Sequence, residues 1–301
     1  MQNQILKYFS KKISQELEMY LNEHIEEIRL RVNKPIILRY DTYETKLKIV
    51  VKTEDILETL QNICENSIYA YQREICEGFI TVRKGHRVGI TGNVVIENEK
   101  VKNIKYISSL NFRIAKEIKD CSKKILKDIL DIESNSVYNT LIVSPPGGGK
   151  TTILRDLIKN ISNGIDEINF KGLNVGLVDE RGEVAAMYKG VPQNDVGLRT
   201  DVLDNIKKAI GMKLLIRSMA PQVICADEIG TYEDIKAIDY AICSGVKGIF
   251  TAHGNTLEQI FLNPILSELL NKHVFERIII LNKKEIEQTH KLSGGKEYVS
   301  Y

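Results

Sequence analysis

The pattern of apolar and polar positions divides the chain into two parts. The first part mixes apolar residues at helical spacing with short alternating runs. Helices are predicted over 5–21, 53–66, 67–77 and 123–130. Strands are predicted over 28–32, 36–39 and 108–115, with a β-rich, glycine-punctuated stretch over 78–96. This mixture predicts a small α+β domain.

Strands and helices alternate regularly in the second part. Short apolar runs predict strands over 141–143, 173–178, 223–226, 248–251 and 275–281. Helical spacing predicts helices over 150–161, 204–219, 235–243 and 257–270. Such alternation indicates βαβ crossovers and an α/β core with a mostly parallel sheet. The last 17 residues, with Gly294-Gly295 between two short runs, predict a hairpin. A polar run at 131–136 places the boundary between domains of 1–132 and 133–301.

A glycine-rich loop stands between the strand at 141–143 and the next helix. It has the strand, loop and helix order of a phosphate-binding P-loop, in which glycine N–H groups and a helix N-terminus surround an anion. Lys150 is placed to reach the β- and γ-phosphates of ATP, and the Thr151 hydroxyl to bind Mg²⁺. Ser144 departs from the usual glycine at the first position; a turn without a ligand is the weaker alternative. The predicted nucleotide-binding residues are Ser144, Pro145, Pro146, Gly147, Gly148, Gly149, Lys150, Thr151 and Thr152.

Acidic residues follow two of the later strands. Ligands of open α/β sheets bind at the carboxyl ends of strands. Asp227 is therefore predicted to hold Mg²⁺ with Thr151, and Glu228 to polarise the attacking water. Glu180 is a candidate for a second water-orienting acid, and it competes with Glu228 for the main role.

Basic residues near the same strand ends have less certain roles. His253 ends the strand that begins at 248 and is a candidate reader of the γ-phosphate, with a structural role as its alternative. No arginine has a compelling place in its own subunit, so we expect a neighbouring subunit to supply one. Arg217 is the first choice over Arg199 and Arg277, and a surface ion pair is its alternative. Arg181 forms an ion pair or points across a subunit interface.

Composition adds few constraints. The 301 residues are 43% hydrophobic and 27% charged, with a net charge of +2, as in ordinary globular proteins. The sequence contains no apolar run near the ~18 residues of a membrane span, and its first residues lack signal-peptide features. Five scattered cysteines predict reduced thiols, so we expect a cytoplasmic protein. Basic residues are concentrated in the second half of the first domain. They form either a solvated face or a surface that contacts nucleic acid or an acidic neighbour. They are Arg73, Arg83, Lys84, His86, Arg87 and Arg113.

Four segments together resemble a known family. SPPGGGKTT, VDERGEVAA, LLIRSMAPQVICADEIG and SGVKGIFTAHG, in this order, resemble the stage III sporulation protein AA family, which is similar to the hexameric type II and type IV secretion ATPases. The resemblance implies a RecA-like core, ATP and Mg²⁺ as ligands, and a homo-oligomeric ring, a hexamer. It also implies membrane-protein partners in a sporulation channel and a position at the inner face of the membrane. The chain lacks the tetracysteine zinc motif of many type II enzymes.

Two classes of function therefore stay open. The first is a motor ATPase of a secretion-like assembly. The second is a RecA-like ATPase acting on single-stranded nucleic acid through the basic β region of the first domain. A nucleotide switch with little turnover is a weaker third, because Glu228 favours hydrolysis.

Overall fold

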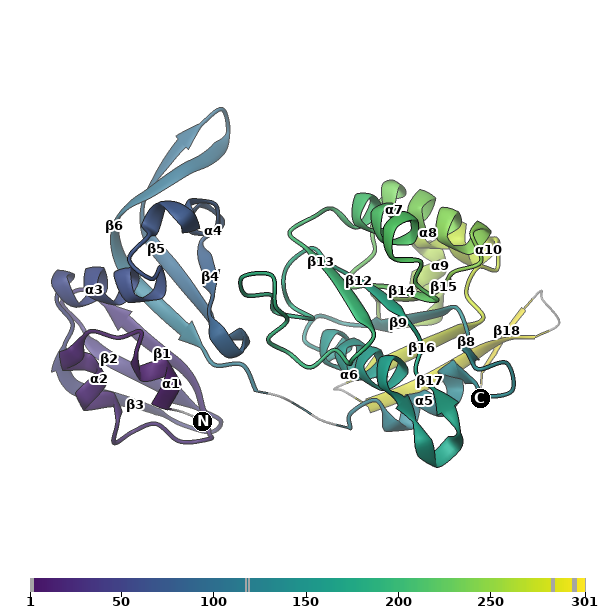
Figure 1. Cartoon of the computed structure of the whole chain (residues 1–301), viewed down its shortest axis with the longest axis horizontal. Coiled ribbons are helices and arrows are strands. Elements are labelled where there is room, and N and C mark those ends of the chain that lie inside the picture. Colours follow the sequence, from purple (N-terminus) through teal and green to yellow (C-terminus); the bar gives the residue numbers. More distant parts are fainter. Residues whose placement is uncertain (1–2, 117, 119, 283–284, 294–296, 301) are drawn as a thin grey trace. The chain divides into compact units, whose positions relative to one another are not determined.

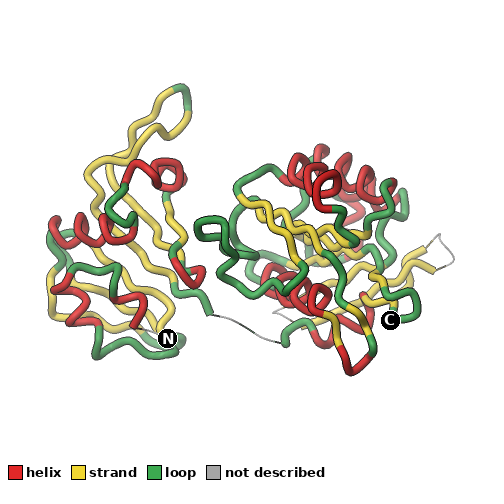
Figure 2. Tube along the Cα trace, in the orientation of Figure 1, coloured by secondary structure: helices red, strands yellow, loops and turns green. Residues whose placement is uncertain are grey.

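The computed structural model describes residues 3–116, 118, 120–282, 285–293 and 297–300. The chain forms two compact units, Met1–Lys116 and Glu117–Tyr301, shown in Figure 1 and, coloured by secondary structure, in Figure 2. The division therefore lies 16 residues before the boundary predicted at 132, and the intervening segment belongs to the second unit.

The helix α5 (Lys123–Ile129) explains this difference. Its apolar residues, among them Ile125 and Ile129, belong to the same buried cluster as the helix that follows the P-loop. Ser122, just before α5, donates hydrogen bonds from N–H (2.8 Å) and Oγ (2.6 Å) to Oδ2 of the buried Asp156. The polar run at 131–136 is thus a turn within the second unit, where β7 (Leu130–Asp131) pairs with β8 (Ser136–Val137).

The first unit is an antiparallel sheet covered by helices. Its strand order is β3-β2-β1-β6-β5-β4. The strands are β1 (Ile25–Arg31), β2 (Pro35–Tyr40), β3 (Glu44–Val50), β4 (Phe79–Thr81), β5 (Arg87–Glu97) and β6 (Lys100–Arg113). The helices are α1 (Asn3–Leu6), α2 (Lys11–Leu17), α3 (Thr53–Ile63) and α4 (Gln72–Glu77). Alternate strand residues such as Leu30 and Phe112 share a core with α2 and α3. The predicted α+β domain is confirmed.

Two local features of this unit differ from the prediction. The helix expected over 5–21 is two helices: the first ends at Leu6, and Ser10 caps the second by accepting the Ile13 N–H at 3.5 Å. The Ser10 hydroxyl in turn donates to Asp55 at 3.0 Å. Strand β3 was not predicted, because it is an edge strand whose only fully buried position is Leu47.

The second unit contains an eight-stranded sheet of order β13-β12-β14-β15-β9-β16-β17-β18. The first six strands in this order are parallel, and β17 and β18 extend the sheet antiparallel. The strands are β9 (Thr140–Ser144), β12 (Val175–Asp179), β13 (Thr200–Asp204), β14 (Val223–Ala226), β15 (Lys247–His253), β16 (Arg277–Asn282), β17 (Glu285–Ser293) and β18 (Glu297–Ser300). A separate ribbon pairs β10 (Gly164–Ile165) with β11 (Phe170–Lys171). The predicted mostly parallel α/β core is confirmed.

Helices cover both faces of this sheet (Figure 1). The helix α6 (Lys150–Asn163) shares one buried cluster with α5 and with strand residues such as Ile142. The opposite cluster joins Leu141 and Val143 to the other helices. These are α7 (Lys208–Met219), α8 (Tyr232–Cys243), α9 (Leu257–Leu262) and α10 (Leu266–Asn271). Because β9 is buried on both faces, its sequence is a continuous apolar run.

Some elements of the second unit differ in detail from the prediction. Strand β13 was not predicted, and the helix expected over 257–270 is split at Pro264, which cannot donate the next helical hydrogen bond. The C-terminal hairpin is present as β17 and β18, and its predicted Gly294-Gly295 turn lies outside the described residues. The five cysteines are free. Among the described residues, no helix has both the length and the apolar character needed to cross a membrane.

The position of α5 gives a test of the domain boundary. A fragment of 117–301 is expected to unfold cooperatively in urea, whereas a fragment of 133–301 is expected to be much less stable or unfolded. The shorter fragment loses Ile125, Leu126 and Ile129, each worth about 1.5–3 kcal/mol when buried, and leaves buried Asp156 without Ser122. Circular dichroism measures the urea midpoint of each fragment. Equal midpoints for the two fragments would instead support the boundary at 132.

Candidate active site

The loop between β9 and α6 can form only with glycine at three positions. Gly147 and Gly149 have φ of 75° and 89°, a left-handed backbone that other residues rarely adopt. A Cβ on Gly148 would lie 2.8 Å from Cβ and Oγ of Ser144. The serine that departs from the usual motif is therefore accommodated by Gly148, and its hydroxyl donates to Pro145 O at 3.0 Å. The loop is a compact turn with no side chains at its tip.

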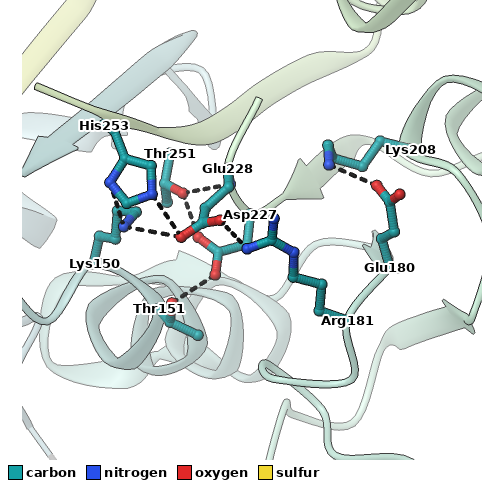
Figure 3. Close-up of polar contacts among 9 residues, drawn as sticks. All are labelled: Lys150, Thr151, Glu180, Arg181, Lys208, Asp227, Glu228, Thr251 and His253. Carbon is teal, nitrogen blue, oxygen red and sulfur yellow. Dashed lines mark hydrogen bonds and ion pairs between the residues drawn. The ribbon is translucent and has the colours of Figure 1, made fainter. Parts of the chain in front are cut away.

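Lys150 begins α6 and is almost completely buried, with 6% of its side chain exposed. Its ammonium group lies 3.2 Å from Oε1 of Glu228 and 3.3 Å from Nδ1 of His253. Figure 3 shows these three side chains converging from α6, the end of β14 and the end of β15. A buried cation requires such partners, because desolvation of an unpaired charge is costly.

A second group of side chains surrounds Asp227. The Thr151 hydroxyl donates to Asp227 Oδ2 at 2.5 Å, and the Thr251 hydroxyl donates to Oδ1 (Figure 3). The Glu228 N–H donates to Thr251 Oγ1 at 2.8 Å. Thr251 was not predicted as a site residue, although its place at the end of the strand before His253 was visible. The carboxylate and hydroxyl oxygens of Asp227 and Thr151 are ligands that suit Mg²⁺, and they adjoin a loop open to phosphate.

Glu228 has an unusual backbone conformation and a shifted carboxyl pKa. Its φ of 55° is left-handed, a strain of about 1–3 kcal/mol for a residue with a side chain. Burial by itself would raise the pKa of its carboxyl group. The hydrogen bond and charge of Lys150, with the charges of His253 and Arg181, outweigh burial and hold the pKa below its usual range. The group is therefore a carboxylate at neutral pH, held by cations on both oxygens.

Asp179, Glu180 and Arg181, at the end of β12, have side chains that contact three different sets of partners. Asp179 is buried and accepts N–H groups of Glu183 (2.9 Å), Val184 (3.1 Å) and Ala185 (2.8 Å). Burial raises the pKa of Asp179, and these hydrogen bonds oppose the rise. Glu180 pairs with Lys208 at 2.6 Å, apart from the group around Lys150 (Figure 3). Arg181 reaches Oε2 of Glu228.

The arginines considered from the sequence occupy other places. Helix α7 follows β13 and returns to the start of β14. Its last turn, with Arg217, therefore lies near the amino ends of the parallel strands, whereas the P-loop lies at their carboxyl ends. Arg217 lies 6.0 Å from the ring of Tyr240. Arg199 donates to Ser162 O at 2.9 Å, and Arg277 to Asp128 O at 3.0 Å. We expected no arginine of the same subunit at the site. This expectation was wrong, because Arg181 donates a hydrogen bond to Glu228.

The structure thus brings together five of the predicted residues and separates two. Lys150, Thr151, Asp227, Glu228 and His253 form one connected group at the carboxyl ends of β9, β14 and β15. Glu180 and Arg217 lie outside the described contacts of this group. A glycine-rich loop at a helix N-terminus, two oxygen side chains that suit Mg²⁺ and an ionised carboxylate are the kinds of group that phosphoryl transfer to water requires.

Comparison of the sequence with known proteins identifies close relatives. The family model described as "Sporulation stage III, protein AA" matches residues 1–294. The chain is 39% identical to the stage III sporulation protein AA of Bacillus subtilis (strain 168) over 259 residues, which cover 86% of this chain and 83% of that protein. It is 29% identical to the uncharacterized protein ycf45 of Porphyra purpurea over 149 residues, 48% of this chain and 24% of that protein.

Solved structures share the fold at low sequence identity. The ATPase DotB of Legionella pneumophila has a TM-score of 0.57 at 15% identity, covering 96% of this chain and 78% of its own. The pilus retraction motor PilT, solved with bound ADP, has a TM-score of 0.55 at 16% identity, covering 96% and 80%. The chain therefore shares the fold of the ATPase DotB and the pilus retraction motor PilT. With the family match over nearly the whole sequence, the chain belongs to the stage III sporulation protein AA family.

Proposed function

We propose that the chain is an ATPase motor of a secretion-like trans-envelope assembly used in endospore formation. It binds Mg-ATP at the P-loop and activates water with Glu228. The observation that carries this proposal is the meeting of Glu228 and Lys150, 3.2 Å apart, beside the glycine loop. The fold shared with DotB and PilT and the sporulation family support it.

Each residue of the site has a role in this reaction. The N–H groups of the loop and the Lys150 ammonium bind the phosphates, and Thr151 and Asp227 hold Mg²⁺, which neutralises phosphate charge. Glu228, ionised at neutral pH, orients the attacking water and accepts its proton. His253 holds Oε1 of Glu228 at 3.0 Å. Glu180, paired with Lys208, becomes the weaker candidate for the water-activating acid.

The motor is proposed to work as a homo-oligomeric ring, a hexamer, in the cytoplasm. Membrane proteins of the sporulation channel would be its partners and would bring it to the inner face of the membrane. The family membership and the motor fold support this placement. In such a ring a neighbour's Arg217 would contact the γ-phosphate, because in its own subunit Arg217 lies near the amino ends of the parallel strands, away from the P-loop.

A second candidate is an ATPase acting on single-stranded nucleic acid. It is favoured by one observation, the polar face of the first unit's sheet, where Arg29, Arg31, Arg87 and Arg113 line a hollow of about 460 Å³. Arginines on a sheet can neutralise phosphates, although Glu27 pairs with Arg29 at 2.6 Å. Filter binding of labelled oligonucleotides across a salt series separates the candidates: steep salt dependence with ATP-coupled affinity would favour nucleic acid.

Lys150→Ala is expected to weaken ATP binding at least about tenfold, because a hydrogen bond to a charged group is worth about 1.5–3 kcal/mol. Fluorescent-nucleotide titration measures this loss. Lys236→Ala, which removes an exposed lysine on α8, is the matched control and should bind ATP normally. Normal affinity and turnover in Lys150→Ala would contradict the P-loop assignment.

Glu228→Gln and Asp227→Asn are expected to separate chemistry from metal binding. Glu228→Gln keeps the side-chain shape but loses the proton acceptor, so it should bind Mg-ATP while kcat falls by ~10²-fold or more. Asp227→Asn should instead raise the Mg²⁺ concentration needed for half-maximal turnover. Steady-state ATPase assays across a Mg²⁺ series measure both. If Glu228→Gln hydrolyses normally and Glu180→Gln does not, the two acids exchange roles.

Turnover is expected to depend on assembly. ATPase assays and sedimentation on one dilution series should show specific activity rising as rings form, since an arginine from a neighbour contributes about 10³–10⁵-fold in other P-loop enzymes. Inactive Arg217→Ala mixed with inactive Glu228→Gln should recover part of the turnover, because some interfaces then contain both intact groups. Constant specific activity in a strictly monomeric sample is the contrary result.

A further inference from the structure

The carboxylate of Glu228 is held from two sides. On one side, Oε1 contacts Lys150 Nζ at 3.2 Å and His253 Nε2 at 3.0 Å. On the other side, Oε2 contacts Nη1 of Arg181 (Figure 3). The two cations differ in setting, because the Lys150 side chain is 6% exposed and that of Arg181 is 68% exposed.

Phosphates at the P-loop would compete for the first side. Lys150 begins the helix that follows the glycine loop, and two of its three ammonium donors already serve Glu228 and His253. A nucleoside triphosphate carries more negative charge than one carboxylate, so it would draw the Lys150 ammonium group away from Glu228. Arg181 would then be the cation of the described site that still holds the carboxylate, together with the His253 ring.

The backbone that carries Arg181 is anchored at several points. Asp179, two residues earlier, accepts three N–H groups of the following loop. Arg155 of α6 donates to Val184 O at 2.7 Å and to Glu183 O at 2.6 Å. The loop is thus tied both to the end of β12 and to the helix that begins with Lys150. A side chain on such a loop starts close to its working position, which reduces the entropy lost in orienting Glu228.

We propose that Arg181 is a positioning residue that acts within its own subunit. It holds Oε2 of Glu228, so that Oε1 faces the attacking water when phosphates occupy Lys150. The inference rests on the proposed ATPase function, which it deepens by assigning the residue that orients the water-activating acid. Arg181 acts through Glu228, in contrast to an arginine that contacts the γ-phosphate directly from a neighbouring subunit.

A double-mutant cycle tests this role. Arg181→Ala should lower kcat at least about tenfold, the effect of losing one charge-assisted hydrogen bond, with KM nearly unchanged. Arg181→Lys should recover part of the loss. In the Glu228→Gln background, Arg181→Ala should cause no further loss, because the acid that it positions is already inactive. Lys189→Gln, which removes an exposed cation on the same loop, is the matched control and should retain wild-type kcat.

A mixing experiment tests whether Arg181 acts within its own subunit. Arg181→Ala and Glu228→Gln chains, carrying different tags, are co-expressed and purified through both tags. If Arg181 acts in its own subunit, no site in the mixed assembly is complete and turnover stays low. Recovery of turnover would place the arginine across a subunit interface and overturn the proposal.

The other contrary results are equally distinct. Unchanged kcat in Arg181→Ala, or an equal loss in the wild-type and Glu228→Gln backgrounds, overturns the positioning role while the ATPase function stands. Absence of turnover in the assembled wild-type protein overturns the proposed function and this inference together.

Discussion

Lys150 places a positive charge inside the second unit, and the arrangement of the site follows from the need to balance it. The ammonium group is buried at the start of α6, so it requires an anion close by. Glu228 supplies that anion from the end of β14, with a left-handed backbone that turns its carboxylate toward Lys150. This pairing is possible only because β15 stands between β14 and β9 in a parallel sheet and brings the three carboxyl ends together.

The surrounding contacts extend this balance across the sheet. Thr251 of β15 donates to Asp227 and accepts the Glu228 N–H, so it fixes the two acids relative to each other. Asp179 and Arg155 both hydrogen-bond the backbone of the loop after β12, from which Arg181 reaches Glu228. The ends of β12, β14 and β15 and the P-loop helix therefore meet at one carboxylate. A change at any of them is transmitted to Glu228 through direct hydrogen bonds and ion pairs.

Sequence patterns predicted those parts whose signals are local in the chain. The glycine loop, Lys150 and the acidic pair at the end of β14 are defined by neighbours a few residues away, and a strand followed by an acid places the acid at the sheet edge. The direction of Arg181 depends on a loop pinned by Asp179 and Arg155, which come from separate elements, so no pattern revealed it. The position of Arg217 within its own subunit was hidden for a related reason: without strand β13, the direction of α7 relative to the site was not apparent. Its action on a neighbouring subunit remains a proposal. The division at 116–117 differs from the predicted boundary at 132 because a polar turn resembles a linker unless the partner of α5 is known.

The central claim is that a buried lysine and an ionised glutamate at the P-loop make this chain an ATPase. Phosphate release from ATP by the purified, assembled wild-type protein tests it most directly, with and without Mg²⁺ and with the oligomeric state measured in the same sample. We expect steady turnover of ATP to ADP and phosphate that requires Mg²⁺ and stops when the metal is chelated. Recovery of bound ATP intact from the assembled protein in Mg²⁺ would contradict it.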